Sequence, residues 1–388
     1  MGIQYISTAI VGDAHKSDIL GVAVSKKFTI TCSSDGFVRL WSNATSEREL
    51  ETELLVDKLG LHHIAIYEDI IKAKKILLIA AVSFNGFAYI LNFNHETSTL
   101  TKLKESQLPS ELTALHTSFW NVQFSKDPNG EFHYLALTVV DGGTQVYDLE
   151  FNVEEGSEDP VLPTLKLKGV ATSKDNSFPT CLDLDPSQMK MVVGHENGNV
   201  YMFDLDRLKL IYEFQALGSN KKLSSETQSS FSAVRSLKFS PGGTLLAVAR
   251  DSGYHGIITL YDVKFGEVIG SLNSGTHSSV IGIGGFAHEK WCLALSFNEE
   301  GTLLASGGMG EKIKIWNVDT KECDAVITIS KTDVSNETLE KESHLDSASC
   351  CSLAFINKGV IANEGTNDGL VVVGFDRAIR WFREAGGI

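Results

Sequence analysis

Long apolar segments, a basic excess and Cys-x-x-Cys pairs are all absent from this chain of 388 residues. The longest apolar run, Ile76 to Val82, is far below the roughly 20 residues that a membrane-spanning helix needs. The start of the chain lacks the basic and apolar regions of a signal peptide, and the six cysteines contain no Cys-x-x-Cys pair. We therefore expect an intracellular protein with reduced thiols.

Positive charge is also scarce, because 34 lysines and arginines stand against 49 aspartates and glutamates, for a net charge of −15. Affinity for nucleic acids comes largely from cations placed on phosphates, and an acidic surface is likewise repelled by anionic membranes. We therefore expect no direct binding to nucleic acid or to membranes.

Enzyme and metal-site motifs are missing as well. The chain has no Gly-x-Ser-x-Gly, no His-Glu-x-x-His and no phosphate-loop lysine. His62-His63 suggests a pair of metal ligands, but successive residues of a strand point to opposite faces, so we expect no shared ion. The sequence thus predicts no catalytic residues, no cofactor and no metal.

What is present is one repeat, in which two apolar strands, a turn and a third strand recur. Its clearest copies begin at Val234 and Leu293, each with a Gly-containing turn between two short strands. Asp-Gly or Asn-Gly turns mark the first four copies, as primed hairpin turns require. The third strand ends in a large residue, in turn Trp41, Leu91, Tyr147, Phe203, Tyr261, Trp316 and Trp381.

These markers recur every 50 to 65 residues, which leaves room for a fourth, outer strand. We place outer strands at Leu210 to Phe214, Val268 to Leu272 and Ala325 to Ile329. Seven such units predict an all-β fold, a single seven-bladed WD-repeat β-propeller over residues 1–388. A WD-repeat unit usually has ~40–45 residues, so the units of this chain are longer than usual. We interpret the additional residues as polar loops, near 153–176, 218–230 and 330–349.

The two ends of the chain complement each other. The last unit, Ser352 to Arg383, lacks an outer strand, whereas Ile3 to Ile10 is strand-like and belongs to no other unit. Pairing the two closes the ring and removes an exposed edge. Two stacked β-sandwiches, the alternative, do not explain one repeat phase along nearly the whole chain.

In WD repeats, a His before the first strand is commonly bonded to the turn Asp and the strand-end Trp. His15, Asp35 and Trp41 fit this network in the first unit. In the sixth unit His288 is present, but Met309-Gly310 stands where the Asp is expected, so we expect an incomplete network there.

Aligned first strands place one residue of each unit at the mouth of the channel. Trp and Arg are the types most enriched at binding hot spots, which favours Trp120 and Arg235. Phe37 extends the same surface. For Trp120 and Trp291 the alternative to a binding role is that they are partly buried packing residues of the blades. The predicted ring is Leu20, His62, Trp120, Thr180, Arg235 and Cys292.

A family resemblance rests on several segments. The most specific is the ending Asp376-Arg-Ala-Ile-Arg-Trp-Phe-Arg-Glu-Ala-Gly-Gly, joined by Leu61-His62-His63, His116-Thr-Ser-Phe-Trp120 and Thr276-His277-Ser278-Ser279. In order along essentially the whole chain, these segments resemble the fungal WD-repeat subunit of the superkiller (Ski) complex.

The resemblance implies a non-enzymatic scaffold in cytoplasmic 3′-to-5′ mRNA decay by the exosome and in antiviral RNA control. The implied partners are the tetratricopeptide-repeat subunit and the RNA helicase of that complex. In fungal meiosis the same propeller also binds the topoisomerase-like protein that makes DNA double-strand breaks, which implies a nuclear pool. Animal relatives join a transcription-elongation complex, and a scaffold of such an assembly is the alternative function.

The family's partners present a Gln-Arg segment with a hydrophobic residue to the top face. On this basis Asp18 would meet the partner Arg, and a hydrophobic slot would be lined by Trp120, Trp291 and Phe37. Arg235 and Arg377 would order the acidic or amide groups around that slot. Three rival classes fit less well. An enzyme would need carboxylates that converge on the channel, and the predicted ring offers only His62. The net negative charge opposes a nucleic-acid-binding module. A G-protein β subunit would begin with a long helix, whereas this chain begins with a strand.

Overall fold

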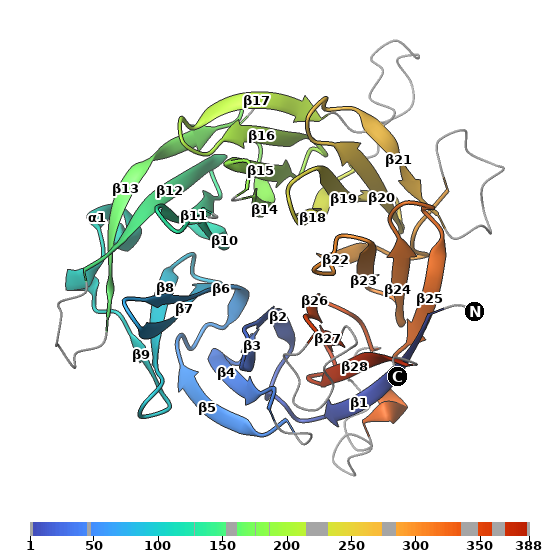
Figure 1. Ribbon diagram of the computed structural model, residues 1–388, viewed down its shortest axis with the longest axis horizontal. Helices are drawn as coiled ribbons and strands as arrows, with labels where there is room; N and C mark the ends of the chain where they lie inside the picture. The colour runs from blue at the N-terminus through green and yellow to red at the C-terminus, as the bar shows by residue number, and fades with distance from the viewer. Residues whose placement is uncertain are drawn as a thin grey trace.

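The computed structural model is a ring of seven four-stranded sheets around a central axis (Figure 1). The structure describes residues 3–44, 48–127, 129–152, 161–174, 176–185, 187–214, 232–273, 285–334, 348–358 and 369–385. Each sheet is one blade, and its strands follow one another from the axis to the circumference (Figure 1). The predicted seven-bladed propeller is therefore confirmed.

Blades 1 to 3 occupy the first part of the chain, and two short helices, η1 (Glu105–Gln107) and α1 (Ser110–Thr113), precede the third. Their strands, from the inside outward, are β2 (Ile19–Val24), β3 (Phe28–Ser33), β4 (Phe37–Ser42) and β5 (Leu50–Leu55); β6 (Leu61–Ile71), β7 (Lys74–Ser83), β8 (Ala88–Asn94) and β9 (Thr99–Lys102); and β10 (Phe119–Lys126), β11 (His133–Val139), β12 (Gly143–Phe151) and β13 (Pro163–Thr172).

Blades 4 to 6 repeat this order, and a third short helix, η2 (Lys331–Asp333), follows them. Their strands are β14 (Pro179–Asp185), β15 (Lys190–His195), β16 (Val200–Asp204) and β17 (Lys209–Phe214); β18 (Val234–Phe239), β19 (Leu245–Ser252), β20 (His255–Asp262) and β21 (Val268–Leu272); and β22 (Cys292–Phe297), β23 (Leu303–Gly308), β24 (Lys312–Asn317) and β25 (Cys323–Thr328).

Blade 7 is built from both ends of the chain. It contains β26 (Ser352–Ile356), β27 (Gly369–Val373), β28 (Ile379–Ala385) and, outermost, β1 (Gln4–Val11). β1 pairs antiparallel with β28, from Gln4 opposite Ala385 to Val11 opposite Ile379. The predicted closure of the ring by the N-terminal strand is confirmed.

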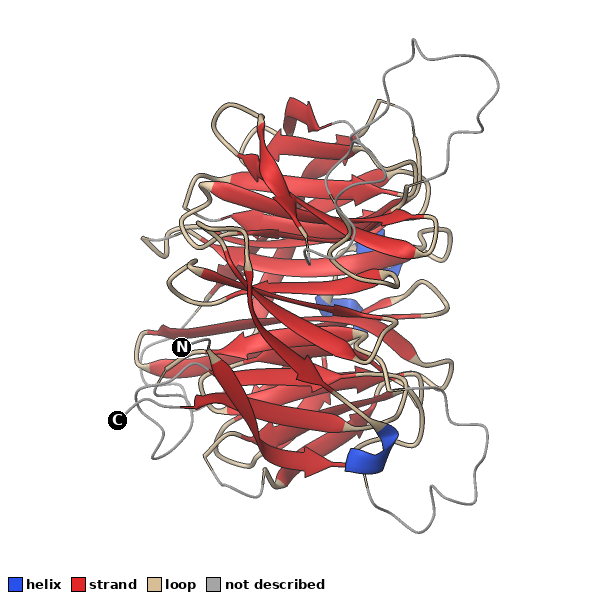
Figure 2. Cartoon of the chain, turned by 90° about the vertical axis from the view of Figure 1, so that its right-hand side faces the viewer, coloured by secondary structure: helices blue, strands red, loops and turns tan. Residues whose placement is uncertain are grey.

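The strands run from one face of the ring to the other, and the loops gather on these two faces (Figure 2). We call the top face the one that carries the connections into each inner strand and the turns between the second and third strands. The lower face carries the remaining turns. Among the described residues, no helix has the length and hydropathy needed to cross a membrane.

The apolar core is divided among the interfaces between blades. Each buried cluster joins two neighbours: Leu78 of blade 2 packs in one cluster with Phe119 of blade 3, and Trp381 of blade 7 packs in another with Trp41 of blade 1. The two Trp rings meet edge to face, with centroids 6.5 Å apart. Since every blade depends on both neighbours, closure stabilises the whole ring.

The turn glycines allow neighbouring blades to approach closely. Gly36 has φ of 86°, and a Cβ at this position would lie 1.9 Å from the carbonyl oxygen of Asp57 in the connection to blade 2. Only glycine satisfies both the positive φ and this contact.

Two expected segment boundaries were wrong. The supposed loop near 153–176 contains β13, the outer strand of blade 3, and the outer strand of blade 6 begins at Cys323 instead of Ala325. The segment 218–230 lies outside the described residues, as does most of 330–349, whose first residues include η2.

Candidate functional site

An irregularity at the start of the inner strands shapes the centre of the top face. In blades 1 to 6 the pairing of the first and second strands shifts register there, for example between Ile19 and Gly21. Such a bulge leaves a residue without a partner and re-aims its side chain. The skipped residues are Leu20, His62, Trp120 with Asn121, Thr180, Arg235 and Leu293.

One member of the predicted ring was wrong. Cys292 pairs with Gly308 and is buried, so Leu293 takes its place at the bulge. The seventh position belongs to Cys351, because the Cys350 amide donates to Gly308 O of blade 6 just as the Ile19 amide donates to Gly374 O of blade 7. His62, although in the ring, is 6% exposed and is covered by its neighbours.

Trp120 lies at the centre of an aromatic cluster that spans blades 2 to 4. Its ring stacks on His62 at 4.5 Å between centroids and meets Phe178 edge to face at 5.1 Å. The ring of Phe84, which is 51% exposed, lies 5.0 Å from that of His62 between centroids. Trp120 is therefore half-buried: its ring packs against His62 and Phe178, and part of the side chain stays exposed to solvent.

The expectation that His62 and His63 point to opposite faces was wrong. Their Nδ1 atoms lie 2.6 Å apart, because the bulge between Leu61 and His63 breaks the alternation of the strand. His62 Nε2 donates to the Ser83 carbonyl at 3.1 Å, so in the neutral ring Nδ1 carries no proton and is the hydrogen-bond acceptor toward His63. Burial lowers the pKa of His62 to about 4 and that of His63 well below its ordinary value, so both rings are neutral at pH 7.

The structure brings two of the predicted residues together across blades 5 and 6. Arg235 lies over the ring of Trp291, 4.4 Å from its centroid, and its Nε and Nη2 donate to Asp251 Oδ2 at 2.7 and 2.6 Å. Trp291 Nε1 donates to the Gly253 carbonyl at 2.7 Å. Both side chains are thus held rigidly, and the sequence pattern had not shown Asp251 as the residue that orients Arg235.

The other three predicted residues lie on blades 7 and 1. Asp18 is half-buried before β2, and its carbonyl accepts from the Ser34 amide. Phe37 is half-buried beneath the guanidinium of Arg39, at 5.3 Å. Arg377 is half-buried in the turn before β28, with φ of 62°. They belong to the top face but to a different sector from Trp120.

A hydrogen-bonded chain joins His15, Asp35 and Trp41 through a fourth residue, Thr31. His15 Nδ1 lies 3.1 Å from Asp35 Oδ2, His15 Nε2 lies 2.8 Å from Thr31 Oγ1, and Trp41 Nε1 donates to that same oxygen at 3.1 Å. Burial acts to raise the pKa of Asp35, but hydrogen bonds from His15 and from backbone amides outweigh it, so this pKa lies well below its ordinary value.

The sixth blade contains the same chain without its acid. His288 Nε2 and Trp316 Nε1 each lie 2.7 Å from Ser306 Oγ. The hydroxyl residue stands ten positions before the Trp in both blades, a spacing that would have revealed it in the sequence. Burial lowers the pKa of His288 to about 3, so this ring is neutral.

The described residues contain no group of three or more His, Cys, Asp or Glu side chains able to hold a metal ion. Burial raises the pKa of the Cys181 and Cys292 thiols to about 12, which makes them poor nucleophiles. The chemistry of the top face is therefore that of contact surfaces: aromatic rings, a guanidinium and carboxylates.

These features define a WD-repeat β-propeller, and the family model described as "WD domain, G-beta repeat" matches residues 8–42 and 283–317. The antiviral protein SKI8 of Saccharomyces cerevisiae is 34% identical over 406 aligned residues, which cover 100% of both chains. The meiotic recombination protein rec14 of Schizosaccharomyces pombe is 30% identical over 69% of this chain and 72% of its own. The chain belongs to the WD-repeat family that includes SKI8 and rec14, as the resemblance of its C-terminal segment implied.

Proposed function

We propose that this protein is a non-enzymatic scaffold whose top face holds segments of partner proteins. The observation that carries the proposal is the exposure of large apolar side chains on the top-face connections of blades 2 and 3. Leu59 is 64% exposed, Phe84 51%, Leu115 81% and Val140 44%, on the same two blades as His62 and the half-buried Trp120. Large apolar groups gathered on one face favour a protein-binding role.

The rigidity of the site supports the same function. The ring is closed, and Arg235 is already fixed between Asp251 and Trp291 before any partner arrives. A preorganised surface loses little conformational entropy on binding, so more of the contact energy appears as affinity.

Family membership supports specific partners. We propose that the protein binds the tetratricopeptide-repeat and helicase subunits of a superkiller complex, and thereby assists exosomal mRNA decay and antiviral RNA control in the cytoplasm. Similarity to rec14, named a meiotic recombination protein, supports a second role with the topoisomerase-like break protein in meiotic nuclei. Affinity purification from vegetative and from meiotic cells, followed by mass spectrometry, tests both roles; recovery of neither partner set would contradict the proposal.

Trp120→Ala tests the site itself. If Trp120 anchors a hydrophobic partner residue, its truncation should weaken binding by about 2–4 kcal/mol, the range of a hot spot. Asp18→Lys should also weaken binding, by repelling a partner Arg. Calorimetry with the propeller-binding segment of the tetratricopeptide subunit measures both.

Phe132→Ala is the matched control, because Phe132 is 54% exposed on the lower face. It should leave affinity unchanged. Unchanged affinity in Trp120→Ala and Asp18→Lys would place the site elsewhere, and a collapsed melting temperature in Trp120→Ala would assign this residue to the core.

A further inference from the structure

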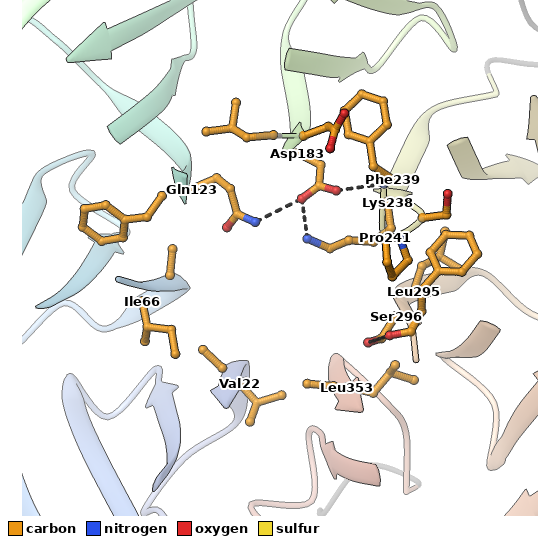
Figure 3. A pocket seen from close by; sticks show the side chains of 18 of the residues that line it. Val22, Ile66, Gln123, Asp183, Lys238, Phe239, Pro241, Leu295, Ser296 and Leu353 are labelled. Carbon is orange, nitrogen blue, oxygen red and sulfur yellow. Dashed lines mark hydrogen bonds and ion pairs between the residues drawn. The ribbon is translucent and has the colours of Figure 1, made fainter. Parts of the chain in front are cut away.

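A cavity of about 490 Å³ opens at the lower mouth of the central channel, on the face opposite Trp120. Figure 3 shows its lining from close by. All seven inner strands line it, together with the lower-face turns that follow β14 and β18. Its volume falls within the roughly 300–1,000 Å³ of pockets that bind small ligands. We call it the lower cavity.

The walls of the lower cavity differ in character. Blades 3 to 5 contribute its polar side chains, and three of these, Gln123, Asp183 and Lys238, point toward one another (Figure 3). The others, Asp185, Ser187 and Ser240, lie where β14 and β18 run into the lower-face turns. The opposite wall is mainly aliphatic, and Figure 3 labels Val22, Ile66, Leu295 and Leu353 there. Its polar side chain, Ser296, already accepts from the Phe355 amide at 3.1 Å. A ligand that fills this space therefore has one polar edge and an aliphatic body.

Hydrogen bonds within the polar wall determine which groups remain for a ligand. Asp183 Oδ1 accepts from Gln123 Nε2 at 3.0 Å and from Lys238 Nζ at 2.7 Å, and Oδ2 accepts from the Phe239 amide at 2.9 Å. Because the Asp183 carboxylate can only accept, the end of the Gln123 amide that faces it is the nitrogen. No group of the described residues donates to the other end, Gln123 Oε1. Lys238 retains N–H groups beyond the one given to Asp183.

Gln123 and Lys238 both donate to Asp183 Oδ1, so their side chains lie next to each other. This places the acceptor of Gln123, Oε1, beside the remaining N–H donors of Lys238 Nζ. The Asp183–Lys238 pair is neutral as a unit. An anionic ligand at Lys238 would approach Asp183, and a cationic one at Asp183 would approach Lys238, so a net charge is disfavoured at this pair. The second carboxylate of the lining, Asp185, is already bonded by the Ser187 amide and hydroxyl and by the Gln188 amide.

A neutral amide satisfies all of these conditions, because its C=O faces Lys238 while its N–H faces Gln123. We propose that the lower cavity binds an uncharged amide carrying a branched aliphatic group. Such a group occurs in a peptide segment and in a free small molecule. This site is independent of the top face, so its failure or success leaves the proposed scaffold function untouched.

A series of three leucine derivatives tests the proposal on the intact protein by ligand-observed NMR titration. N-acetyl-leucinamide is neutral, N-acetyl-leucine is an anion and leucinamide is a cation. The neutral compound should bind saturably, with Kd on the order of millimolar for a ligand of this size. The two charged compounds should bind about tenfold more weakly or not at all, because burial penalises an unpaired charge. Equal binding of all three, or none by the neutral compound, would overturn the proposal.

Gln123→Leu removes the acceptor and leaves the Asp183–Lys238 pair in place. It should weaken binding of N-acetyl-leucinamide about tenfold, the loss of one good hydrogen bond. Gln4→Leu, on the exposed outer strand β1, is the control and should bind as the wild type does. Retained affinity in a folded Gln123→Leu protein would contradict the proposal; should this variant not fold, the charge series on the wild type decides alone.

An acetylated and amidated Ala-Leu-Ala tripeptide distinguishes the two sources of the amide. Tighter binding than N-acetyl-leucinamide assigns the cavity to a peptide segment, and weaker binding assigns it to a free small molecule. Both results require the saturable binding that the proposal predicts.

Discussion

The hydroxyl of Thr31 determines the proton arrangement of the buried chain in blade 1. Trp41 Nε1 can only donate, so Thr31 Oγ1 accepts from it. His15 faces the ionised Asp35 through Nδ1, which therefore carries the proton and leaves Nε2 as an acceptor for the Thr31 hydroxyl. Burial is the main influence on His15 and lowers its pKa, which keeps the ring neutral. Every polar group of the chain is satisfied only when Thr31 both accepts and donates.

Thr31→Val should therefore destabilise the protein although it changes the shape little. It leaves Trp41 Nε1 and His15 Nε2 buried without partners, at a cost of roughly 2–4 kcal/mol. Urea unfolding measures the change, and Thr172→Val, at an exposed position of β13, is the control that should stay near wild type. A loss below about 0.5 kcal/mol, the scatter of ordinary surface substitutions, would show that water replaces the hydroxyl.

His62 should make stability depend on pH. Its pKa is about 4 in the fold against 6.5 when unfolded, so the unfolded chain binds the proton more readily between these values. The free energy of unfolding should be independent of this group above pH 6.5 and should fall by roughly 3 kcal/mol as the pH approaches 4. His62→Gln, which keeps a donor for Ser83, should flatten this dependence in urea titrations across the range. His116→Gln, at an exposed site, should not; identical slopes in both variants would disprove the assignment.

Individual contacts were harder to predict than residue types. Trp120, Arg235 and Trp291 were selected because of their chemistry, and the structure places all three half-buried on the top face. The error at Cys292 arose because the first strand of blade 6 was aligned one residue too early: β22 begins at Cys292, so Leu293 stands at the bulge. The error at His62-His63 was caused by the bulge that opens its inner strand. A bulge shifts the alternation by one residue and carries no composition signal in these segments, so a strand pattern read as regular assigns the wrong neighbour.

At the level of elements, the ring depends on a strand that is remote in sequence from its partners. β1 covers the edge of β28, and its Tyr5 packs against the cluster between blades 6 and 7. Ala9 and Val11 pack against the cluster between blades 7 and 1. The periodicity of the chain predicted this strand because blade 7 was one strand short. It did not predict β13, since the alternation from Pro163 to Lys168 lies inside a polar segment longer than an ordinary turn.

Deletion of residues 1–11 should open the ring at blade 7. The unpaired edge of β28 would expose backbone donors and acceptors, which promotes association between copies. We expect a lower melting temperature and larger particles in light scattering than for the full chain. A synthetic peptide of residues 1–14 supplied to the truncated protein should restore both, and a monodisperse truncated protein with an unchanged melting temperature would show that blade 7 is stable with three strands.

At the scale of the whole molecule, the net negative charge disfavours binding to nucleic acids but not binding to proteins. The chain carries a net charge of −15, and a phosphate backbone gains affinity only where cations replace its counterions. Even the lysine-rich turn of blade 2, with Lys72, Lys74 and Lys75, faces a molecule whose overall field repels RNA. A role in RNA decay is therefore expected to operate through partner proteins.

The purified propeller should accordingly show no measurable binding to single-stranded RNA at physiological salt. Fluorescence anisotropy with a labelled oligonucleotide, measured over a range of salt concentrations, is the direct test. Weak binding at low salt is compatible with the charge argument only if it disappears with rising salt and in the double variant Lys74→Glu, Lys75→Glu, which removes the local cations. Binding that is tight at physiological salt, or that survives this double variant, would mean that bases are recognised by stacking on exposed aromatic side chains. The scaffold would then contact RNA itself, and the separation between the two kinds of partner would be wrong.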